Sequence, residues 1–457
     1  MNASGHPRVA IAYDCLFPVD TGGGERVYRR MAELFAERGG EVSYLTRDGR
    51  EQPDAPFAVV GLWRGEIADR EGTRHSGAAL GFAWALFCHL LTHRRRYDLV
   101  VVAALPVLNV LGVRCALLGS RVVIATDWLE IWHARRWREY SGAVIGTVAW
   151  VLQWCGIRVG HIQSVNSDFT RARMIRYRPR ADPLVLGLID LVAGSVDDIR
   201  VGGDARDGGE AARGTEVGVG DAGAAGVGDA GAVGAAAREA GTGDSAPMPD
   251  APTNHRAPFM LSIGRHIPDK QMASLPGALA RARRDIPELV AVIAGTGPDT
   301  DLILAAARDE GMSGQIQLVG RVSDREIASL LNSAAVLVHP SRREGFGLVI
   351  AEAAAHGTPS VVVAGSDNAA AELVVNGVNG FVAASVAPHE MGGAIVRVLR
   401  ADRSLRESTR SWFERERVTR SLGGSVDEIL RRWQERAGER SPRATRGGMP
   451  RPEVLRE

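Results

Sequence analysis

Four charged side chains in the C-terminal half of the chain have the types and spacing of a ligand-binding site. Arg265 and Lys270 follow an apolar segment, and Glu344 and Glu352 lie on either side of Gly345–Gly347. Arginine can bind a diphosphate through a bidentate fork, and lysine can bind it as a point charge. Carboxylates instead accept hydrogen bonds from hydroxyl groups. The combination suits a ligand that carries both phosphates and sugar hydroxyls, whereas solvated surface charges are the alternative for either cation alone.

The segment around the two glutamates predicts a turn that leads into a helix. An apolar strand, Val336–His339, comes before Gly345-Phe346-Gly347, and a helix that carries Glu352 follows. The N-terminus of a helix exposes unpaired N–H groups and binds anions, and glycine lets the backbone approach a ligand closely. The alternative is an ordinary strand–turn–helix unit with two surface glutamates, because short motifs have many false positives.

Six strand-like segments alternate with helical segments after Pro258: residues 259–264, 289–295, 316–320, 336–339, 360–363 and 380–382. In the commonest doubly wound order, 3-2-1-4-5-6, strands one and four are neighbours and their loops diverge. The loop after strand one carries Arg265 and Lys270, and the loop after strand four carries Glu344. The sequence therefore predicts that the basic and acidic residues meet in one crevice.

The N-terminal part predicts a second domain of the same class. Arg8–Tyr13 has the composition of a buried parallel strand, and Gly22–Gly24 precedes an amphipathic helix over Glu25–Arg38. Further strand-like segments alternate with helices: residues 41–46, 58–62, 99–103, 121–126, 161–166 and 183–187. The expected fold class is α/β, with two doubly wound, Rossmann-like domains.

A segment rich in tryptophan and arginine follows the strand predicted to end at Thr126. Asp127–Gly142 contains three tryptophans together with Arg135, Arg136 and Arg138. Aromatic rings beside arginines can stack on a sugar or lie against a membrane surface. Because the preceding strand delivers this loop to the carboxyl edge of the sheet, we expect it to recognise an acceptor; an irregular loop fixed by its own aromatics is the alternative.

Composition and charge limit the class of partner and the compartment. A net charge of +1 creates no overall field that would recruit nucleic acid. The four cysteines form no CxxC pair, so a disulfide framework or zinc site is not expected and a reducing cytosol is. The N-terminus has no signal-peptide pattern. A cytoplasmic location is expected.

One apolar segment, Gly77–Leu91, leaves open a contact with a membrane. Its length of about 15 residues falls short of the roughly 20 that cross a bilayer. A buried helix of an α/β layer is favoured. Peripheral contact at the inner face of the cytoplasmic membrane is the alternative, because arginines follow the segment.

Composition also divides the chain into units. Residues 1–192 form the N-terminal domain, 258–402 the C-terminal domain, and 403–437 charged helices that could pack back on the first domain. Residues 193–257 are rich in glycine and alanine, with little apolar bulk to offset the entropy of ordering, and are expected to be a disordered insertion. Residues 438–457 are expected to be a disordered tail.

Other catalytic chemistries have weaker support. Asp299-Thr300-Asp301 could hold a divalent metal, but an aspartate at a helix start more often caps the helix. No serine, cysteine or histidine has the spacing of a nucleophile motif. His266 and His339 could contact sugar or phosphate, or be structural.

With these residues in view, the chain resembles the family-4 retaining glycosyltransferases of GT-B architecture (glycosyl transferases group 1). The resemblance covers both domains, without the insertion and the tail. It rests on five segments, of which the last is the most specific: GGGER from Gly22, NSDFT from Asn166, GLID from Gly187, GR from Gly264 with Lys270, and HPSRREGFGLVIAEAAAHGTPSVV from His339.

The resemblance implies two domains that face each other across a cleft, with the donor held mainly by the second. Glu352 would bind the ribose, Arg265 and Lys270 the diphosphate, and Glu344 the sugar hydroxyls. Backbone amides near Phe346, Gly347 and Leu348 would assist, and Gly23 and Gly24 would contact the donor from the first domain. The implied reaction moves a hexose from a nucleotide sugar to a glycan, lipid-linked or small-molecule acceptor with retained configuration. The resemblance implies no protein nucleophile, no metal and no cofactor, because the nucleotide sugar is a substrate.

Three positions depart from the family pattern. Asp127 stands where many relatives have histidine, and a contact of Asp127 with the donor sugar is a hypothesis that an unaffected alanine variant would reject. Gln271 replaces a usual glycine. Asp367-Asn368-Ala369 replaces a frequent glycine pair beside the sugar, which leaves the donor open. A nucleotide-sugar 2-epimerase of the same fold and a non-catalytic binding subunit are the alternative functions.

Overall fold

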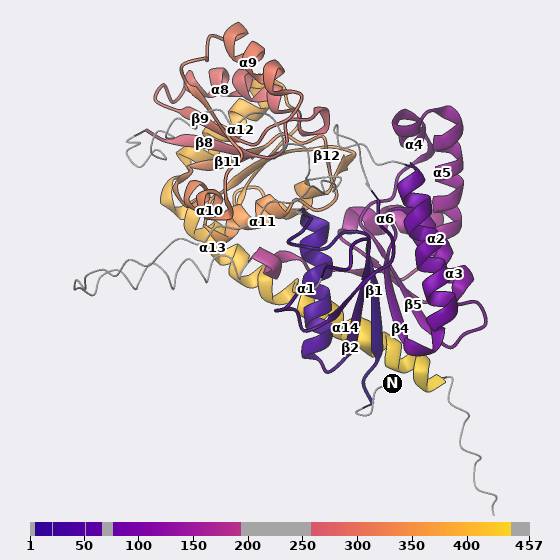
Figure 1. Ribbon diagram of the computed structural model, residues 1–457. Helices are drawn as coiled ribbons and strands as arrows, with labels where there is room; N and C mark the ends of the chain where they lie inside the picture. Colours follow the sequence, from indigo (N-terminus) through magenta and orange to yellow (C-terminus); the bar gives the residue numbers. More distant parts are fainter. Residues whose placement is uncertain (1–4, 21, 51, 66–75, 193–256, 440–457) are drawn as a thin grey trace, which may run out of the picture.

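The computed structural model describes residues 5–20, 22–50, 52–65, 76–192 and 257–439. The described chain forms two α/β lobes, and the helices of the C-terminal end run from the second lobe back along the first (Figure 1). The segment expected to be a disordered insertion lies outside the described residues except for its last position, and the expected tail does so except for its first two. Neither expectation is tested here.

The N-terminal lobe contains a parallel sheet whose described strands have the order β3-β2-β1-β4-β5-β6-β7. Its strands are β1 (Arg8–Ala12), β2 (Glu41–Thr46), β3 (Ala58–Gly61), β4 (Leu99–Ala103), β5 (Val123–Trp128), β6 (Ile162–Val165) and β7 (Leu184–Val185). Its helices are α1 (Gly23–Glu37), α2 (Ser76–His93), α3 (Val107–Ala116), α4 (Ala134–Ser141), α5 (Ala143–Gly156) and α6 (Asp168–Tyr177), with short 3-10 turns η1 (Arg94–Arg96) and η2 (Ile189–Val192).

The C-terminal lobe contains a second parallel sheet in the order β10-β9-β8-β11-β13-β15. Its strands are β8 (Phe259–Ile263), β9 (Val290–Ala294), β10 (Ile316–Gly320), β11 (Val336–His339), β13 (Ser360–Val363) and β15 (Gly380–Ala383). Its helices are α8 (Leu275–Arg283), α9 (Thr300–Asp309), α10 (Asp324–Ser333), α11 (Leu348–Ala355) and α12 (Pro388–Arg400), with 3-10 turns η3 (Pro268–Lys270), η4 (Met272–Ser274) and η5 (Ala369–Leu373).

The predicted doubly wound topology is confirmed in both lobes. β8, the first strand of its domain, pairs with β11, the fourth, with Val336 opposite Met260 and Leu337 opposite Leu261. The central strands β4, β11 and β13 are buried along their whole length, as expected when helices cover both faces of a parallel sheet. The loops after strands one and four therefore begin side by side.

Two local features differ from the sequence-based expectation. β5 runs to Trp128 rather than ending at Thr126, so that Asp127 is a strand residue. Two short segments, β12 (Arg343–Glu344) and β14 (Asp367–Asn368), pair with each other outside the main sheet. This small ladder fixes the backbone of Glu344, and its two-residue strands are too short to leave a periodic signal in the sequence.

The C-terminal helices connect the two lobes. α13 (Asp402–Thr419) packs on α11, and α14 (Leu422–Glu439) contacts α1 of the N-terminal lobe (Figure 1). Arg38 of α1 forms an ion pair with Asp427 of α14. The backbone N–H of Gly187 donates to Ser425 Oγ at 2.8 Å. Of the expected charged helices, α14 thus lies against the N-terminal lobe and α13 packs on the second lobe.

An exposed apolar face remains on two helices of the N-terminal lobe. Leu80 and Trp84 of α2 are 59% and 67% exposed, and α5 exposes Val144, Ile145 and Val148. The opposite side of α2 is buried on the sheet, as predicted for a core helix. In the described part of the chain no helix has both the length and the hydropathy to cross a membrane.

Candidate active site

The turn before α11 has a conformation that requires glycine. Gly347 is the N-cap of α11 and has φ 96°, in the left-handed region. A Cβ at this position would lie 2.6 Å from Cβ of Ala370, so both backbone angle and space exclude a larger residue. The first N–H groups of α11 have no partner within the helix. Phe346, Gly347 and Leu348 lie at this helix start, and a contact of their backbone N–H groups with a ligand stays a prediction.

Glu344 lies at the centre of the site and is held by three side chains. Its Oε1 forms an ion pair with Lys270 Nζ, accepts from His339 Nε2 at 2.7 Å and from Ser341 Oγ at 3.1 Å. Burial alone would raise the pKa of Glu344, but the charge of Lys270 and the hydrogen bond from His339 bring that pKa well below its usual range. Glu344 is therefore a fixed anion.

Arg265 lies near Glu344 without pairing to it. Burial lowers the pKa of Arg265, and the charges of Glu344 and Asp269 act in the opposite direction. Among the residues that the structure describes, no carboxylate oxygen lies within 4.0 Å, the limit for an ion pair, of the Arg265 guanidinium. The predicted basic and acidic clusters therefore meet. Lys270 contacts Glu344, and the charge of Glu344 acts on the pKa of Arg265. A partly desolvated guanidinium with no such partner is suited to bind an anionic ligand.

Glu352 lies where the second lobe meets α1 of the first. Burial raises the pKa of Glu352, and the charge of Arg26 partly opposes this rise. The carboxylate lies 3.6 Å from Arg26 Nη1. A Cβ added at Gly23 would lie 3.0 Å from Leu348 Cδ1, and one at Gly24 would lie 3.0 Å from Tyr13 Oη. The glycine turn of the first lobe therefore faces the start of α11.

Asp127 is the predicted site residue whose surroundings differ most from expectation. It is fully buried, and its two oxygens accept hydrogen bonds from Tyr28 Oη and Ser164 Oγ, both at 2.6 Å. Burial raises its pKa despite these bonds. Because no carboxylate oxygen reaches the surface, direct contact with a sugar is not favoured by this geometry. A catalytic role for Asp127 stays a prediction, and a positioning role fits better.

Ion pairs join the two lobes across the cleft. Arg136 of α4 pairs with Asp269 at 3.1 Å, Arg173 of α6 pairs with Asp367, and Arg343 pairs with Glu130. Arg343 also lies over the ring of Trp132, 4.1 Å from its centroid. The tryptophan-rich loop thus contacts the second lobe beside Glu344. The sequence indicates this loop, which includes Glu130, but not its partners Asp269 and Arg343 in the second lobe, because charged pairs distant in sequence leave no local pattern.

Both histidines and Asn368 have hydrogen-bond partners within the protein, whereas Asp299 caps no helix through its side chain. Asp299 precedes α9 as its N-cap residue, although its side chain makes no capping hydrogen bond. His266 Nδ1 lies 2.8 Å from Thr300 Oγ1, and His339 orients Glu344. Asn368 is buried and donates to the carbonyl oxygens of Ser341 and Val363. This asparagine fixes the loop for which the family resemblance implies a glycine pair.

Gln271, the other departure from the family pattern, is strained. It has φ 50° and is the one non-glycine residue with positive φ in the described chain. The left-handed conformation costs an L-residue about 1–2 kcal/mol, and glycine avoids this cost but loses about 0.5–1 kcal/mol of backbone entropy on folding. We expect Gln271→Gly to raise the free energy of unfolding by up to about 1 kcal/mol.

Denaturant titration measures this change. Ala273→Gly, two residues further on in η4, is the control, because there glycine relieves no backbone strain; it adds entropy to the unfolded chain and removes a methyl group that packs against the core. The control substitution Ala273→Gly should lower the free energy of unfolding. Equal destabilisation by both substitutions would show that Gln271 contributes contacts worth more than its strain.

Part of this chain is similar in sequence to known proteins. Residues 248–414 match the family described as Glycosyl transferases group 1. Over 139 residues, 30% of this chain, the sequence is 35% identical to glycogen synthase from Mycobacterium tuberculosis. The matched segment spans 32% of that relative, about a third of its length. The family match therefore covers the lobe that carries Arg265, Lys270, Glu344 and Glu352.

Solved structures share the fold over nearly the whole chain. Sucrose-phosphate synthase from Thermosynechococcus elongatus covers 94% of this chain and 99% of its own, with a TM-score of 0.68 at 16% identity. The match to HepE from Anabaena, solved with UDP-glucose, covers 94% of this chain and 100% of HepE, with a TM-score of 0.59 at 15% identity. The fold is thus GT-B, with a second domain similar in sequence to group 1 glycosyltransferases.

Proposed function

We propose that this protein is a retaining glycosyltransferase that moves a hexose from a nucleoside-diphosphate sugar to a hydroxyl group of an acceptor. The observation that carries the proposal is the meeting of Arg265, Lys270 and Glu344 at one edge of the second sheet, beside the start of α11. The group 1 match of the same lobe supports it. So does the fold shared with a protein solved with UDP-glucose.

Each side chain has a separate task in the proposed reaction. Arg265 and Lys270 bind the diphosphate and stabilise the charge that builds on it as the bond to the sugar breaks. Glu344 accepts hydrogen bonds from the hydroxyls of the transferred sugar, and Glu352 from the ribose. The N–H groups at the start of α11 contribute further donors. Gly23 and Gly24 contact the donor from the first lobe.

The proposed sugar transfer needs no reactant other than the donor and the acceptor. The bond between the sugar's anomeric carbon and the β-phosphate oxygen breaks, and a bond from that carbon to the acceptor oxygen forms on the same face. The proton of the acceptor hydroxyl goes to the leaving phosphate oxygen. The products are the glycosylated acceptor, with its anomeric configuration retained, and a nucleoside diphosphate. No protein nucleophile or metal takes part in this scheme.

A donor screen tests the proposal. UDP, GDP, dTDP and ADP sugars are incubated with the protein, and release of nucleoside diphosphate and the anomeric configuration of the product are measured. One nucleotide class should raise the thermal midpoint, because a ligand that binds only the folded form stabilises it. Release of free 2-epimerised sugar without any acceptor would indicate the epimerase instead. Binding of no nucleotide sugar would contradict the proposal.

The exposed apolar face of α2 and α5 supports a peripheral contact with a membrane, which we propose as the place where a lipid-linked acceptor is reached. Exposed arginines of η1 follow α2 directly. On α5, Trp154 is 42% exposed and Arg158 lies over its ring, 3.5 Å from the centroid. Apolar side chains with an arginine flank suit an anionic lipid surface.

Vesicle sedimentation measures this contact. We expect binding to phosphatidylglycerol vesicles that exceeds binding to phosphatidylcholine vesicles and falls with salt. Ile145→Glu with Val148→Glu should weaken it at least tenfold, because each buried apolar side chain contributes about 1.5–3 kcal/mol. Leu302→Glu on α9, at a leucine 56% exposed in the other lobe, is the control. Equal binding by all three proteins would contradict a role for this face.

A further inference from the structure

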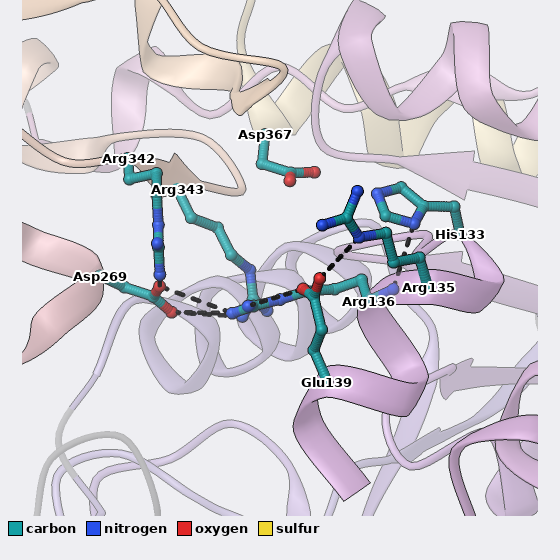
Figure 2. Close-up of a pocket in the computed structure, with 8 residues that line it drawn as sticks. All are labelled: His133, Arg135, Arg136, Glu139, Asp269, Arg342, Arg343 and Asp367. Carbon is teal, nitrogen blue, oxygen red and sulfur yellow. Dashed lines mark hydrogen bonds and ion pairs between the residues drawn. The ribbon is translucent and has the colours of Figure 1, made fainter. Parts of the chain in front are cut away.

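A cavity of about 230 Å³ lies between the lobes beside the Lys270–Glu344 pair. Side chains of both lobes face it (Figure 2): His133, Arg135, Arg136 and Glu139 from the first lobe, and Asp269, Arg342, Arg343 and Asp367 from the second. Its volume is below the roughly 300–1,000 Å³ of pockets that enclose a whole drug-sized ligand. The cavity is therefore suited to one chemical group of a larger molecule.

Three guanidinium groups of this cavity share one carboxylate. Asp269 accepts from Arg342 Nη2 at 2.7 Å and from Arg136 Nη2 at 3.1 Å, and it lies 3.5 Å from Arg343 Nη1. Burial would raise the pKa of Asp269, but the hydrogen bond from Arg342 and the charges of the three arginines lower it. Two further carboxylates share the load: Glu130 pairs with Arg343, and Glu139 lies 3.8 Å from Arg136 but also pairs with Arg135. This corner of the cavity therefore keeps a small excess of positive charge.

Many donors in the cavity have no protein acceptor. A guanidinium carries five N–H donors. Arg136 Nε is buried and has no hydrogen-bond partner in the described structure. Arg342 is 57% exposed with Asp269 as its partner, and Arg135 is 85% exposed with Glu139 as its partner. Across the whole lining four arginines face three carboxylates, which leaves an excess of one positive charge. An anionic group would take up the free donors.

We propose that this cavity binds a phosphate group carried by the acceptor. The inference rests on the proposed transferase function and names the chemical class of its acceptor, a phosphate ester with a free hydroxyl. Arginine forks match the geometry of phosphate oxygens and bind them bidentately. Asp269 and Glu139 hold the forks in place and do not themselves contact the ligand.

The position of the cavity relative to Glu344 fits an acceptor rather than the donor. Arg343 directly precedes Glu344 in β12, and Asp269 directly precedes Lys270. Glu352, the expected ribose ligand, instead lies against Arg26 of α1, so the two ends of the site are built from different elements of the first lobe. A phosphate in the cavity would place a neighbouring hydroxyl of the same molecule beside Lys270 and Glu344.

Phosphorus-31 NMR of inorganic phosphate tests the cavity directly. The donor site is first saturated with the nucleoside diphosphate that the protein releases, so that phosphate cannot bind there. The wild-type protein should broaden the inorganic phosphate signal. The double variant Arg135→Gln, Arg342→Gln should abolish the broadening, and Arg138→Gln, an exposed arginine of α4 outside the lining, should retain it. No broadening by the wild type, or equal broadening by all three, would overturn the proposal.

Transfer assays then identify the source of the phosphate. A hexose 6-phosphate and glycerol 3-phosphate are compared with hexose and glycerol, and phosphatidylinositol vesicles with phosphatidylcholine vesicles. The double variant should raise the KM for the phosphorylated acceptor at least tenfold and leave the KM for the donor unchanged. Soluble esters that accept sugar indicate a free phosphate ester, and acceptance by phosphatidylinositol alone indicates a lipid headgroup. Neutral acceptors used as well as phosphorylated ones would overturn the proposal.

The failure of this inference is distinguishable from failure of the proposed function. Slow hydrolysis of the donor in the absence of acceptor reports the donor site alone. A protein that hydrolyses its donor but treats phosphorylated and neutral acceptors alike contradicts only the phosphate cavity. A protein that neither binds nor hydrolyses any nucleotide sugar contradicts the transferase itself.

Discussion

Replacing Arg265 with glutamine is expected to lower kcat by about 10²–10³-fold, the usual cost of removing one preorganised donor to a developing charge. The same substitution should leave the free energy of unfolding unchanged or raised. Burial lowers the pKa of Arg265, so the folded protein disfavours the charged guanidinium, and none of the described carboxylates forms an ion pair with it. Steady-state kinetics and denaturant titration measure the two effects.

Two further variants make this prediction specific. Arg265→Lys keeps the charge but loses the bidentate fork, and should give intermediate turnover. Arg308→Gln, an exposed arginine of α9, should change neither quantity. A loss of stability in Arg265→Gln that matches the loss of activity would show that Arg265 is structural, and full activity would remove it from the site.

Replacing Glu344 with glutamine should impair both stability and activity. The substitution leaves the ammonium of Lys270, 20% exposed, without its counter-ion, and removal of one partner of a buried pair costs about 3–5 kcal/mol. The folded-state pKa of Glu344 is depressed, so its contribution to stability is present above the unfolded pKa, about 4.3, and is lost as the pH falls toward the folded-state pKa. The difference between wild type and variant should therefore shrink in acid.

A double-variant cycle separates the two effects. Glu344→Gln combined with Lys270→Met removes both charges, and should recover much of the lost stability because no unpaired charge stays buried. Turnover should stay low, since neither the diphosphate nor the sugar hydroxyls then find their partners. Recovery of turnover in the double variant would mean that the pair only holds the loop together.

The doubly wound fold could be predicted because parallel strands buried on both faces leave continuous apolar segments. The order of the second sheet followed from strand count and the commonest topology. That order places the loop after β8 beside the loop after β11, which is why the meeting of Lys270 and Glu344 was predictable across more than seventy residues.

The rest of the site depends on contacts between the lobes, which no local pattern encodes. The cluster of arginines on Asp269 combines residues of α4 with residues of η3 and β12. The burial of Asp127 could not be predicted from the sequence for a related reason. Strand β5 continues through it because Tyr28 and Ser164 satisfy its carboxylate inside the lobe, and the sequence alone does not show that these partners are present.

Calorimetric titration of the nucleoside diphosphate into wild type and Arg265→Gln tests the central claim, that the cations and carboxylates form one donor site. We predict one binding site per chain in the wild type and an affinity at least tenfold weaker in the variant, a difference of about 1.4 kcal/mol. Equal affinity in the two proteins, with both folded, would contradict the assignment of the diphosphate to this crevice.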